Sequence, residues 1–228
     1  MGQCVDARSI VSLFNFAKLK PSFFEPFNSQ NMGQNCIGIE RLIVHADQYD
    51  DLYAIFEERV SKLRVGSVMS PQQAGYISIV DGGAMINNDR FNGIENLIKE
   101  AVDGNAYLVG GSEFKNHPYH PQGYFFQPTV VGPVDKSMGI AQQERRSFRF
   151  VWIMSSFLWL GPLVFAPVAV LMPYATIEEA IDIANDTRYG LGASVFGPDQ
   201  DECLKVAKRL ECGMVSINDF GTFYVSFC

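Results

Sequence analysis

The stretch VAVLMPYATIEEAIDIANDTRYGLGASVF, residues 168–196, decides the fold class of this 228-residue chain. It opens with an apolar run, 168–174, that is typical of a buried strand. Thr176 and Glu179 then form a Thr-x-x-Glu capping box ahead of IEEAIDIAN, which predicts the start of a helix. The run ASVF predicts another strand. A strand, a helix and a strand in this order predict a βαβ unit with parallel strands.

The same alternation continues toward the N-terminus. RLIVH (41–45) predicts a strand, and Asp47 is expected to cap the helix that follows it. The apolar stripe of this helix consists of Leu52, Ile55, Phe56 and Leu63. A second helix is expected to begin at about Asn88. Gly104 is suited to the position just after its end. Its apolar stripe consists of Phe91, Ile94, Leu97, Ile98 and Ala101.

The remaining periodic segments fit the same pattern. AYLVGG (106–111) predicts a strand, and YFFQPTVV (124–131) is expected to be extended, with Pro128 indicating an edge or a bulge. DQDECLKVAKRLEC (199–212) predicts an amphipathic helix, and MVSIND (214–219) predicts the next strand. The sequence therefore predicts the α/β class, with an open, mostly parallel, doubly wound sheet flanked by helices.

Composition excludes several classes of protein. The net charge of −7 and the pI of about 5.0, with no basic patch, argue against a nucleic-acid-binding protein. The five cysteines are Cys4, Cys36, Cys203, Cys212 and Cys228. Their odd number and the absence of a Cys-x-x-Cys pair argue against a disulfide framework and a structural zinc site. We expect no metal site and a reducing compartment, with a cytoplasmic location favoured.

One segment resembles a membrane span. Residues 150–172 carry no charge over 23 positions, and about 20 apolar residues are enough to cross a bilayer. Pro162 and Pro167 argue against one straight helix. A membrane-anchored protein that uses residues 150–172 remains an alternative at this stage.

Cys36 lies in QNMGQNCIGIER, residues 30–41, and has two interpretations. A free thiol has a pKa near ~8.5, so a cysteine nucleophile needs help from a helix N-terminus, backbone N–H groups or a base. Gly33 allows close approach of the backbone, and the polar Gln34 and Asn35 are compatible with an exposed loop-to-helix junction. The alternative is a buried, inert cysteine.

Two other features have no predicted catalytic role. Gly190-x-Gly192 lacks the third glycine of a dinucleotide fingerprint, and a strand is expected after it where the fingerprint requires a helix. Cys203 and Cys212 are expected to be core or surface thiols.

The cysteine segment resembles a known family. GQNCIGIER (33–41) is similar to the cysteine motif of the aldehyde dehydrogenase superfamily, Gly-Gln-x-Cys with an arginine five residues on. Other family-like segments follow in the family's order: KLRVG (62–66), GYFFQPTVV (123–131), FAPVAVLMPYATIEEAIDIANDTRYGLGASVF (165–196) and GMVSIND (213–219). The resemblance covers roughly residues 30–144 and 164–224.

This resemblance implies an activity and residues for it. Cys36 would attack an aldehyde carbonyl, its backbone N–H would help to hold the oxyanion, and NAD or NADP would accept hydride. Water would then release a carboxylic acid from the thioester. The family's Glu-x-Phe-Gly-Pro pattern implies that Glu144 and Phe165 bind the cofactor. The family also implies a small-molecule aldehyde as substrate and a homo-oligomer.

The resemblance is interrupted between Glu144 and Phe165. Removing residues 145–163 restores an uninterrupted family match, QQE-VFAPV, so we expect a foreign apolar insert there. The expected division is a leader without family resemblance (1–29), a first catalytic part (30–144), the insert (145–163), a continuation (164–224) and a tail (225–228). A genuine insertion that acts as an anchor is the alternative.

The chain carries only part of the family pattern. In the family, the general-base glutamate, the oxyanion asparagine and most of the cofactor domain precede the cysteine, whereas 35 residues precede Cys36 here. We therefore expect this polypeptide to have little or no dehydrogenase activity. Two alternatives stay open: an inactive interaction partner of full-length subunits, and cofactor-free esterase chemistry at Cys36.

Overall fold

A computed structural model describes residues 10–14, 30–35, 38–67, 80–110, 122–142, 166–187 and 189–219. Its strands are β1 (Ile10–Phe14), β2 (Ile39–His45), β3 (Tyr107–Gly110), β4 (Thr129–Gly132), β5 (Val168–Tyr174), β6 (Gly192–Phe196) and β7 (Met214–Ile217). Its helices are α1 (Ala46–Val60), α2 (Phe91–Asp103), α3 (Gly139–Gln142), α4 (Ile177–Asn185) and α5 (Gln200–Ala207). A short 3-10 segment, η3, spans Gln30–Gly33.

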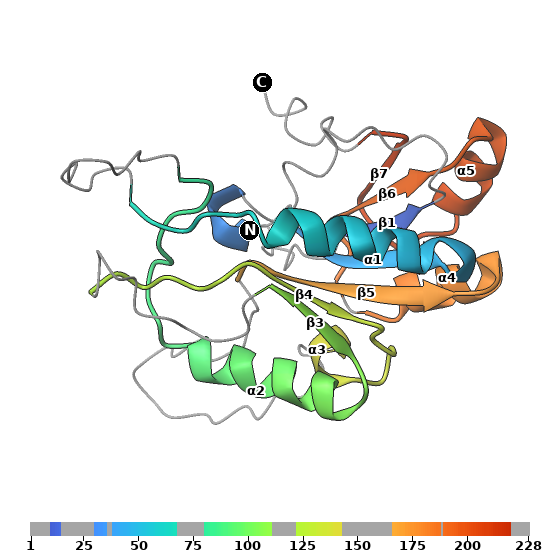
Figure 1. The fold of residues 1–228 in the computed structure, drawn as a ribbon. Coiled ribbons are helices and arrows are strands. Elements are labelled where there is room, and N and C mark those ends of the chain that lie inside the picture. Colours follow the sequence, from blue (N-terminus) through green and yellow to red (C-terminus); the bar gives the residue numbers. More distant parts are fainter. Residues whose placement is uncertain are drawn as a thin grey trace, which may run out of the picture.

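The strands form one seven-stranded sheet in the order β3-β4-β5-β2-β1-β6-β7 (Figure 1). β3 and β4 are antiparallel, and every other neighbouring pair in this sheet is parallel. The expected unit β5-α4-β6 is present, although β2 and β1 lie between its two strands. The predicted α/β class with a mostly parallel sheet is confirmed.

Helices cover both faces of the sheet, as a parallel sheet requires. α1 buries Leu52, Phe56 and Val60 against one face, where they share a hydrophobic cluster with residues of β2, β4 and β5. The buried residues of α4 and α5, and those of α2 other than Leu97, belong to a second cluster on the other face. In Figure 1, α1 and α2 accordingly lie on opposite sides of the strands.

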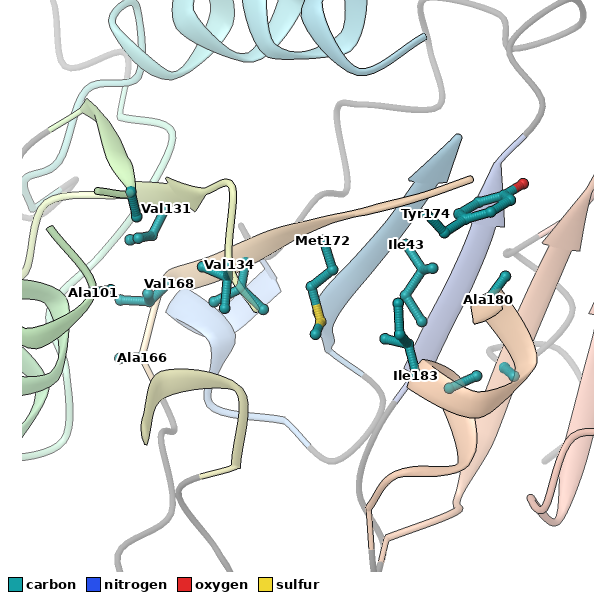
Figure 2. Packing of buried hydrophobic residues seen from close by; sticks show 14 of the residues in the cluster. Ile43, Ala101, Val131, Val134, Ala166, Val168, Met172, Tyr174, Ala180 and Ile183 are labelled. Atoms are coloured by element: carbon teal, nitrogen blue, oxygen red, sulfur yellow. The ribbon is translucent and has the colours of Figure 1, made fainter. Parts of the chain in front are cut away.

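β5 runs through the centre of the core. Its alternate residues serve the two clusters, with Val170 and Met172 in one and Ala169 and Leu171 in the other. Figure 2 shows Met172 in the cluster that also contains Ile43 of β2 and Ile183 of α4. The continuous apolar run that predicted this strand therefore reflects burial on both faces.

This strand corrects the membrane interpretation for the second half of its range. Residues 168–172 belong to β5, which pairs with β2 on one side and β4 on the other. A helix that spans 150–172 is therefore wrong for these residues. Residues 143–165, which include the whole of the expected insert, lie outside the described residues. Among the described helices, none combines the length and the apolar composition needed to cross a bilayer.

β1 is a strand that the sequence did not predict. It lies inside the expected leader, between β2 and β6, and is parallel to both. Its register places Ser12 opposite Leu42 of β2 and Ser194 of β6. The leader therefore contributes to the middle of the sheet and joins β6 and β7 to the other strands.

Helix boundaries differ in detail from the predictions. The predicted N-cap of α4 is confirmed, because Thr176 accepts a hydrogen bond from the Glu179 N–H (3.2 Å). The Glu179 carboxylate accepts from the N–H of Ala175, one residue before the cap (2.8 Å), so the reciprocal half of the capping box is shifted by one residue. The cap predicted for α1 is wrong: His45 is the N-cap and its Nδ1 accepts from the N–H of Asp47, which lies in the first turn.

Other differences concern the ends of elements. The stripe of α2 is buried as predicted, but the left-handed residue after the helix is Asn105 (φ 72°), while Gly104 has φ −85°. α5 ends at Ala207, short of the predicted end at 212. Pro128 marks neither an edge nor a bulge, because β4 is an interior strand that begins one residue later.

Candidate functional site around the cysteine segment

The three predicted site residues, Cys36, Glu144 and Phe165, lie outside the described residues. The structure describes the chain on both sides of Cys36 and close to the other two. Residues 30–35 lead into the cysteine and β2 begins at Ile39, so the described chain enters a strand there and the predicted loop-to-helix junction is wrong. The described segments that flank these residues therefore define the candidate site.

A left-handed turn precedes the cysteine. Asn31 (φ 51°, ψ 30°), Met32 (φ 56°, ψ 43°) and Gly33 (φ 70°) all have positive φ. Left-handed backbone costs an ordinary residue roughly 1–2 kcal/mol, glycine avoids this cost and asparagine tolerates it, so Met32 is the strained position. Strain of this kind persists only where the surroundings enforce it, and it is concentrated at functional sites.

Hydrogen bonds between Asn31 and Gln34 close the turn. The Asn31 side chain donates to the Gln34 carbonyl (3.1 Å), and the Gln34 side chain donates to the Asn31 carbonyl (2.9 Å). The Gln34 backbone N–H also donates to the Asn31 carbonyl (3.1 Å). These reciprocal bonds close the turn from Asn31 to Gln34 and hold residues 31–33 in the left-handed form.

Two further contacts fix the turn to residues 80–86. The Gln34 side-chain oxygen accepts a hydrogen bond from the Ile86 N–H (2.9 Å). Met32 is only 2% exposed, and a Cβ added to Gly82 would lie 2.3 Å from its sulfur. Glycine at position 82 thus makes room for the strained methionine.

The segment under the turn is itself well supported. The Arg64 guanidinium donates to the Asp81 carboxylate (2.9 and 3.2 Å), and Gly66 N donates to the Gly82 carbonyl (2.9 Å). Arg64 holds the pKa of the Asp81 carboxyl below its usual range, mainly by this side-chain hydrogen bond. Met85 N also donates to the Tyr124 carbonyl (2.6 Å). Hydrogen bonds with Arg64, Gly66 and Tyr124 therefore position the segment that contacts the turn.

The last residue of the cysteine motif, Arg41, is a buried cation on β2. It is 4% exposed, and its guanidinium donates to the carbonyls of Ile183 (3.1 Å) and Ala184 (2.9 Å) at the end of α4. The last carbonyls of a helix lack partners within the helix and carry partial negative charge, which favours a cation there. Arg41 thus ties the strand that follows Cys36 to α4.

The segment leading to Glu144 is tied to the same end of α4. Gln142, the last residue of α3, donates to the carbonyl (3.1 Å) and to the carboxylate (2.7 Å) of Asp186. Lys136 pairs with the Asp182 carboxylate, which raises the pKa of the lysine. The cysteine strand and the chain before Glu144 therefore meet at the C-terminal end of α4.

The structure places two features for which no catalytic role is predicted, the thiols of Cys203 and Cys212 and the Gly190-x-Gly192 segment. Cys203 is 4% exposed and Cys212 is half-buried, and burial raises the pKa of both thiols. Gly192 begins β6, so Gly190-x-Gly192 precedes a strand and is not a dinucleotide turn. Within the described ranges, no group of three or more His, Cys, Asp or Glu side chains is arranged to hold a metal ion.

Sequence reasoning missed the supporting residues. Arg41 stood in the recognised motif but received no role, although an arginine inside an apolar strand segment is itself a signal of a buried partner. Gln34 is the glutamine of the Gly-Gln-x-Cys motif, but its position there and its polarity predict no partner for its side chain. Its partner Ile86 is 52 positions away, and no local pattern connects the two.

The segments described above match a known protein family. The sequence model of the Aldehyde dehydrogenase family matches residues 26–147 and 163–227. An aldehyde dehydrogenase-like protein of Saccharomyces cerevisiae is 44% identical over 199 residues, which is 86% of this chain and 27% of that protein. The 3,6-anhydro-alpha-L-galactose dehydrogenase of a Vibrio species is 30% identical over 188 residues, covering 82% of this chain and 34% of the enzyme.

Solved structures give the same result. Betaine aldehyde dehydrogenase of Staphylococcus aureus, solved with NAD+, superposes with a TM-score of 0.73 at 27% identity, covering 95% of this chain and 39% of that one. Aldehyde dehydrogenase C of Pseudomonas syringae, a cysteine-to-alanine mutant solved with NAD+ and octanal, gives a TM-score of 0.71 at 28% identity, covering 93% and 39%. The chain spans only 27–34% of the length of four curated relatives, including the two named above.

Proposed function

This chain belongs to the aldehyde dehydrogenase family, and from that premise we propose that Cys36 is the nucleophile in the oxidation of an aldehyde to a carboxylic acid. The observation that carries the proposal is the braced left-handed turn at residues 31–33, directly ahead of the Gly-Gln-x-Cys motif. Strained backbone that is held in place by hydrogen bonds and packing, here by Asn31, Gln34 and the Ile86 N–H, is typical of a functional site.

The chemistry follows from the properties of a thiolate. Attack by the Cys36 sulfur forms a carbon–sulfur bond and moves the carbonyl electron pair onto oxygen, where a backbone N–H can stabilise it. NAD or NADP, when bound, would supply the hydride acceptor: the carbon would lose its hydride and the C=O bond would re-form, which leaves a thioester on Cys36. Water then adds to the thioester carbon and the carbon–sulfur bond breaks, which releases the carboxylic acid and returns the thiol.

NAD or NADP is the cofactor that family membership supports. The described residues contain no glycine-rich turn that joins a strand to a following helix, so they do not form a dinucleotide site by themselves. We assign Glu144 and Phe165 to the cofactor by their place in the family pattern and derive no step from them. The hydrogen bonds from Gln142 to Asp186 support this assignment, because they fix the chain two residues before Glu144.

We also propose that residues 145–163 are foreign to the catalytic unit. The family match breaks off at 147 and resumes at 163. Ala141 of α3 packs against the hydrophobic cluster to which Ala166 belongs, so both described ends of this interval contribute to the same face of the core. Sequencing the mature transcript tests this proposal, and a transcript that keeps the codons for 145–163 would contradict it.

An activated ester tests the nucleophile without the cofactor. With 4-nitrophenyl acetate we expect a burst of nitrophenolate of about one equivalent per chain, because a thiolate acylates faster than the thioester hydrolyses. Cys36→Ala should abolish the burst, and Cys203→Ala is the control because that thiol is buried. A burst that persists in Cys36→Ala would refute the proposal. Absence of a burst, together with co-purification with full-length subunits, would favour an inactive interaction partner.

A further inference from the structure

Gln34 makes the hydrogen bonds that connect the cysteine segment to the rest of the fold. Its side-chain nitrogen donates to the Asn31 carbonyl (2.9 Å), and its side-chain oxygen accepts from the Ile86 N–H (2.9 Å). One side chain thus closes the left-handed turn and fastens it to the segment 80–86. The partners are a local carbonyl and a distant N–H, so both ends of the amide are used.

The left-handed conformation needs such support. Asn31 and Met32 are consecutive non-glycine residues with positive φ (51° and 56°). The buried Met32 side chain packs over Gly82. The two hydrogen bonds of Gln34 fix the orientation of the turn, because their geometry allows only one placement of the side-chain amide. Without Gln34, the turn would keep its packing and lose its orientation.

The segment that receives Gln34 is positioned independently of the turn. Asp81 N and Gly82 N donate to the Arg64 carbonyl (2.8 and 3.1 Å), and Met85 N donates to the Tyr124 carbonyl (2.6 Å). The Ile86 side chain is 86% exposed, so the described contact between this residue and the turn is its backbone N–H. The Ile86 N–H therefore fixes the position of the Gln34 side chain at the end of the turn.

We propose that Gln34 is a positioning residue that sets the reactivity of the Cys36 thiol two residues later. This inference rests on the proposed role of Cys36 as the nucleophile. Gln34 acts through the geometry of residues 31–34, which it fixes relative to Ile86.

The test uses substitutions that remove one partner at a time. Gln34→Met keeps the length of the side chain and removes both hydrogen bonds. Ile86→Pro removes the N–H donor, and Ile86→Ala is its reference because it removes the same exposed side chain and keeps the N–H. Gln200→Met, at the exposed start of α5, is the matched control for a glutamine-to-methionine change. The double variant Gln34→Met, Ile86→Pro completes a cycle.

The measured quantity is the rate of alkylation of Cys36 by iodoacetamide at neutral pH, followed by peptide mass spectrometry. We expect Gln34→Met to slow this rate about tenfold, toward that of a simple thiol with a pKa near ~8.5, and to shift its pH profile upward. Ile86→Pro should have a similar effect that adds little in the double variant. Alkylation of the buried Cys203, measured in the same samples, should not change.

Three outcomes would overturn the positioning role. The first is an unchanged Cys36 rate in Gln34→Met, and the second is Cys36 and Cys203 changing together, which would indicate general loosening of the fold. The third is a wild-type Cys36 no faster than glutathione, which would also overturn the proposed nucleophile. Fast alkylation of the wild type with an equally fast Gln34→Met would refute the positioning role alone.

Discussion

At the scale of single residues, Arg41 is the buried charge on which two elements depend. Its guanidinium donates hydrogen bonds to the buried carbonyls of Ile183 and Ala184 and so links β2 to the end of α4. We expect Arg41→Met to lower the free energy of unfolding by about 3 kcal/mol, because hydrogen bonds from a charged donor are lost and polar groups stay buried. Urea denaturation measures this loss.

The control for that change is Lys208→Met, which removes a cation from an exposed position at the end of α5. It should change the free energy of unfolding by less than about 0.5 kcal/mol, as surface substitutions usually do. Equal losses in the two variants would show that Arg41 has no special structural role.

The ion pair of Arg64 and Asp81 predicts a pH dependence. The pKa of Asp81 is lowered in the folded protein, so its ionised form stabilises the fold above the unfolded pKa of about 3.9, and this contribution is lost as the pH falls through the folded value. We expect Asp81→Asn to be less stable than the wild type at neutral pH, and the difference to shrink below about pH 4. Urea unfolding between pH 7 and pH 3 measures this, and a difference that stays constant down to pH 3 would contradict it.

The site could be predicted from the sequence only at its centre. A four-residue motif and the order of the other segments are the basis for proposing Cys36 as the nucleophile. The residues that brace it could not be identified, because Gln34–Ile86 and Arg41–Ile183 are contacts between residues 52 and 142 positions apart. Such pairs arise from the packing of the whole sheet, and single-sequence periodicity carries no information about them.

At the scale of elements, the N-terminus of α4 depends on one hydroxyl. Thr176 accepts from the Glu179 N–H at 3.2 Å. Thr176→Ala should cost about 1 kcal/mol of unfolding free energy, because an N–H in the first turn loses its acceptor, whereas Thr176→Ser should cost much less. Thermal or urea unfolding of the three proteins gives the comparison, and indistinguishable Ala and Ser variants would contradict the capping role.

β1 should be essential to the sheet although it lies in the leader. Ser12 lies opposite Leu42 on one side and Ser194 on the other, so both neighbours share the backbone groups of this strand. Ser12→Pro removes a ladder N–H and should destabilise the protein by about 2 kcal/mol or more. Ser12→Ala keeps the N–H and is the matched control. If the Pro variant unfolds at the same urea concentration as the Ala variant, β1 contributes little.

Most elements could be predicted from local pattern, and β1 shows why some could not. β5 and α4 have strong signals, a seven-residue apolar run and a capping box. β1 is a strand mainly because β2 and β6 pair with it, and that pairing depends on segments far away in the sequence. The shortened α5 has a similar cause, because Asn185 at the end of α4 binds the Arg209 carbonyl (2.9 Å) beyond the last helical turn.

At the scale of the whole molecule, the described residues form one sheet with helices on both faces. The cysteine strand and the chain before Glu144 both anchor at the C-terminal end of α4. This arrangement matches solved aldehyde dehydrogenase structures, and the chain spans roughly a third of the length of its relatives.

The most direct measurement locates the acyl group after reaction with an activated ester. Intact-mass and peptide mass spectrometry of the acid-quenched protein should show one acyl group, carried by the peptide that contains Cys36. An adduct on Cys203 or Cys212, or no adduct while the protein is folded, would contradict the central claim that Cys36 is the nucleophile.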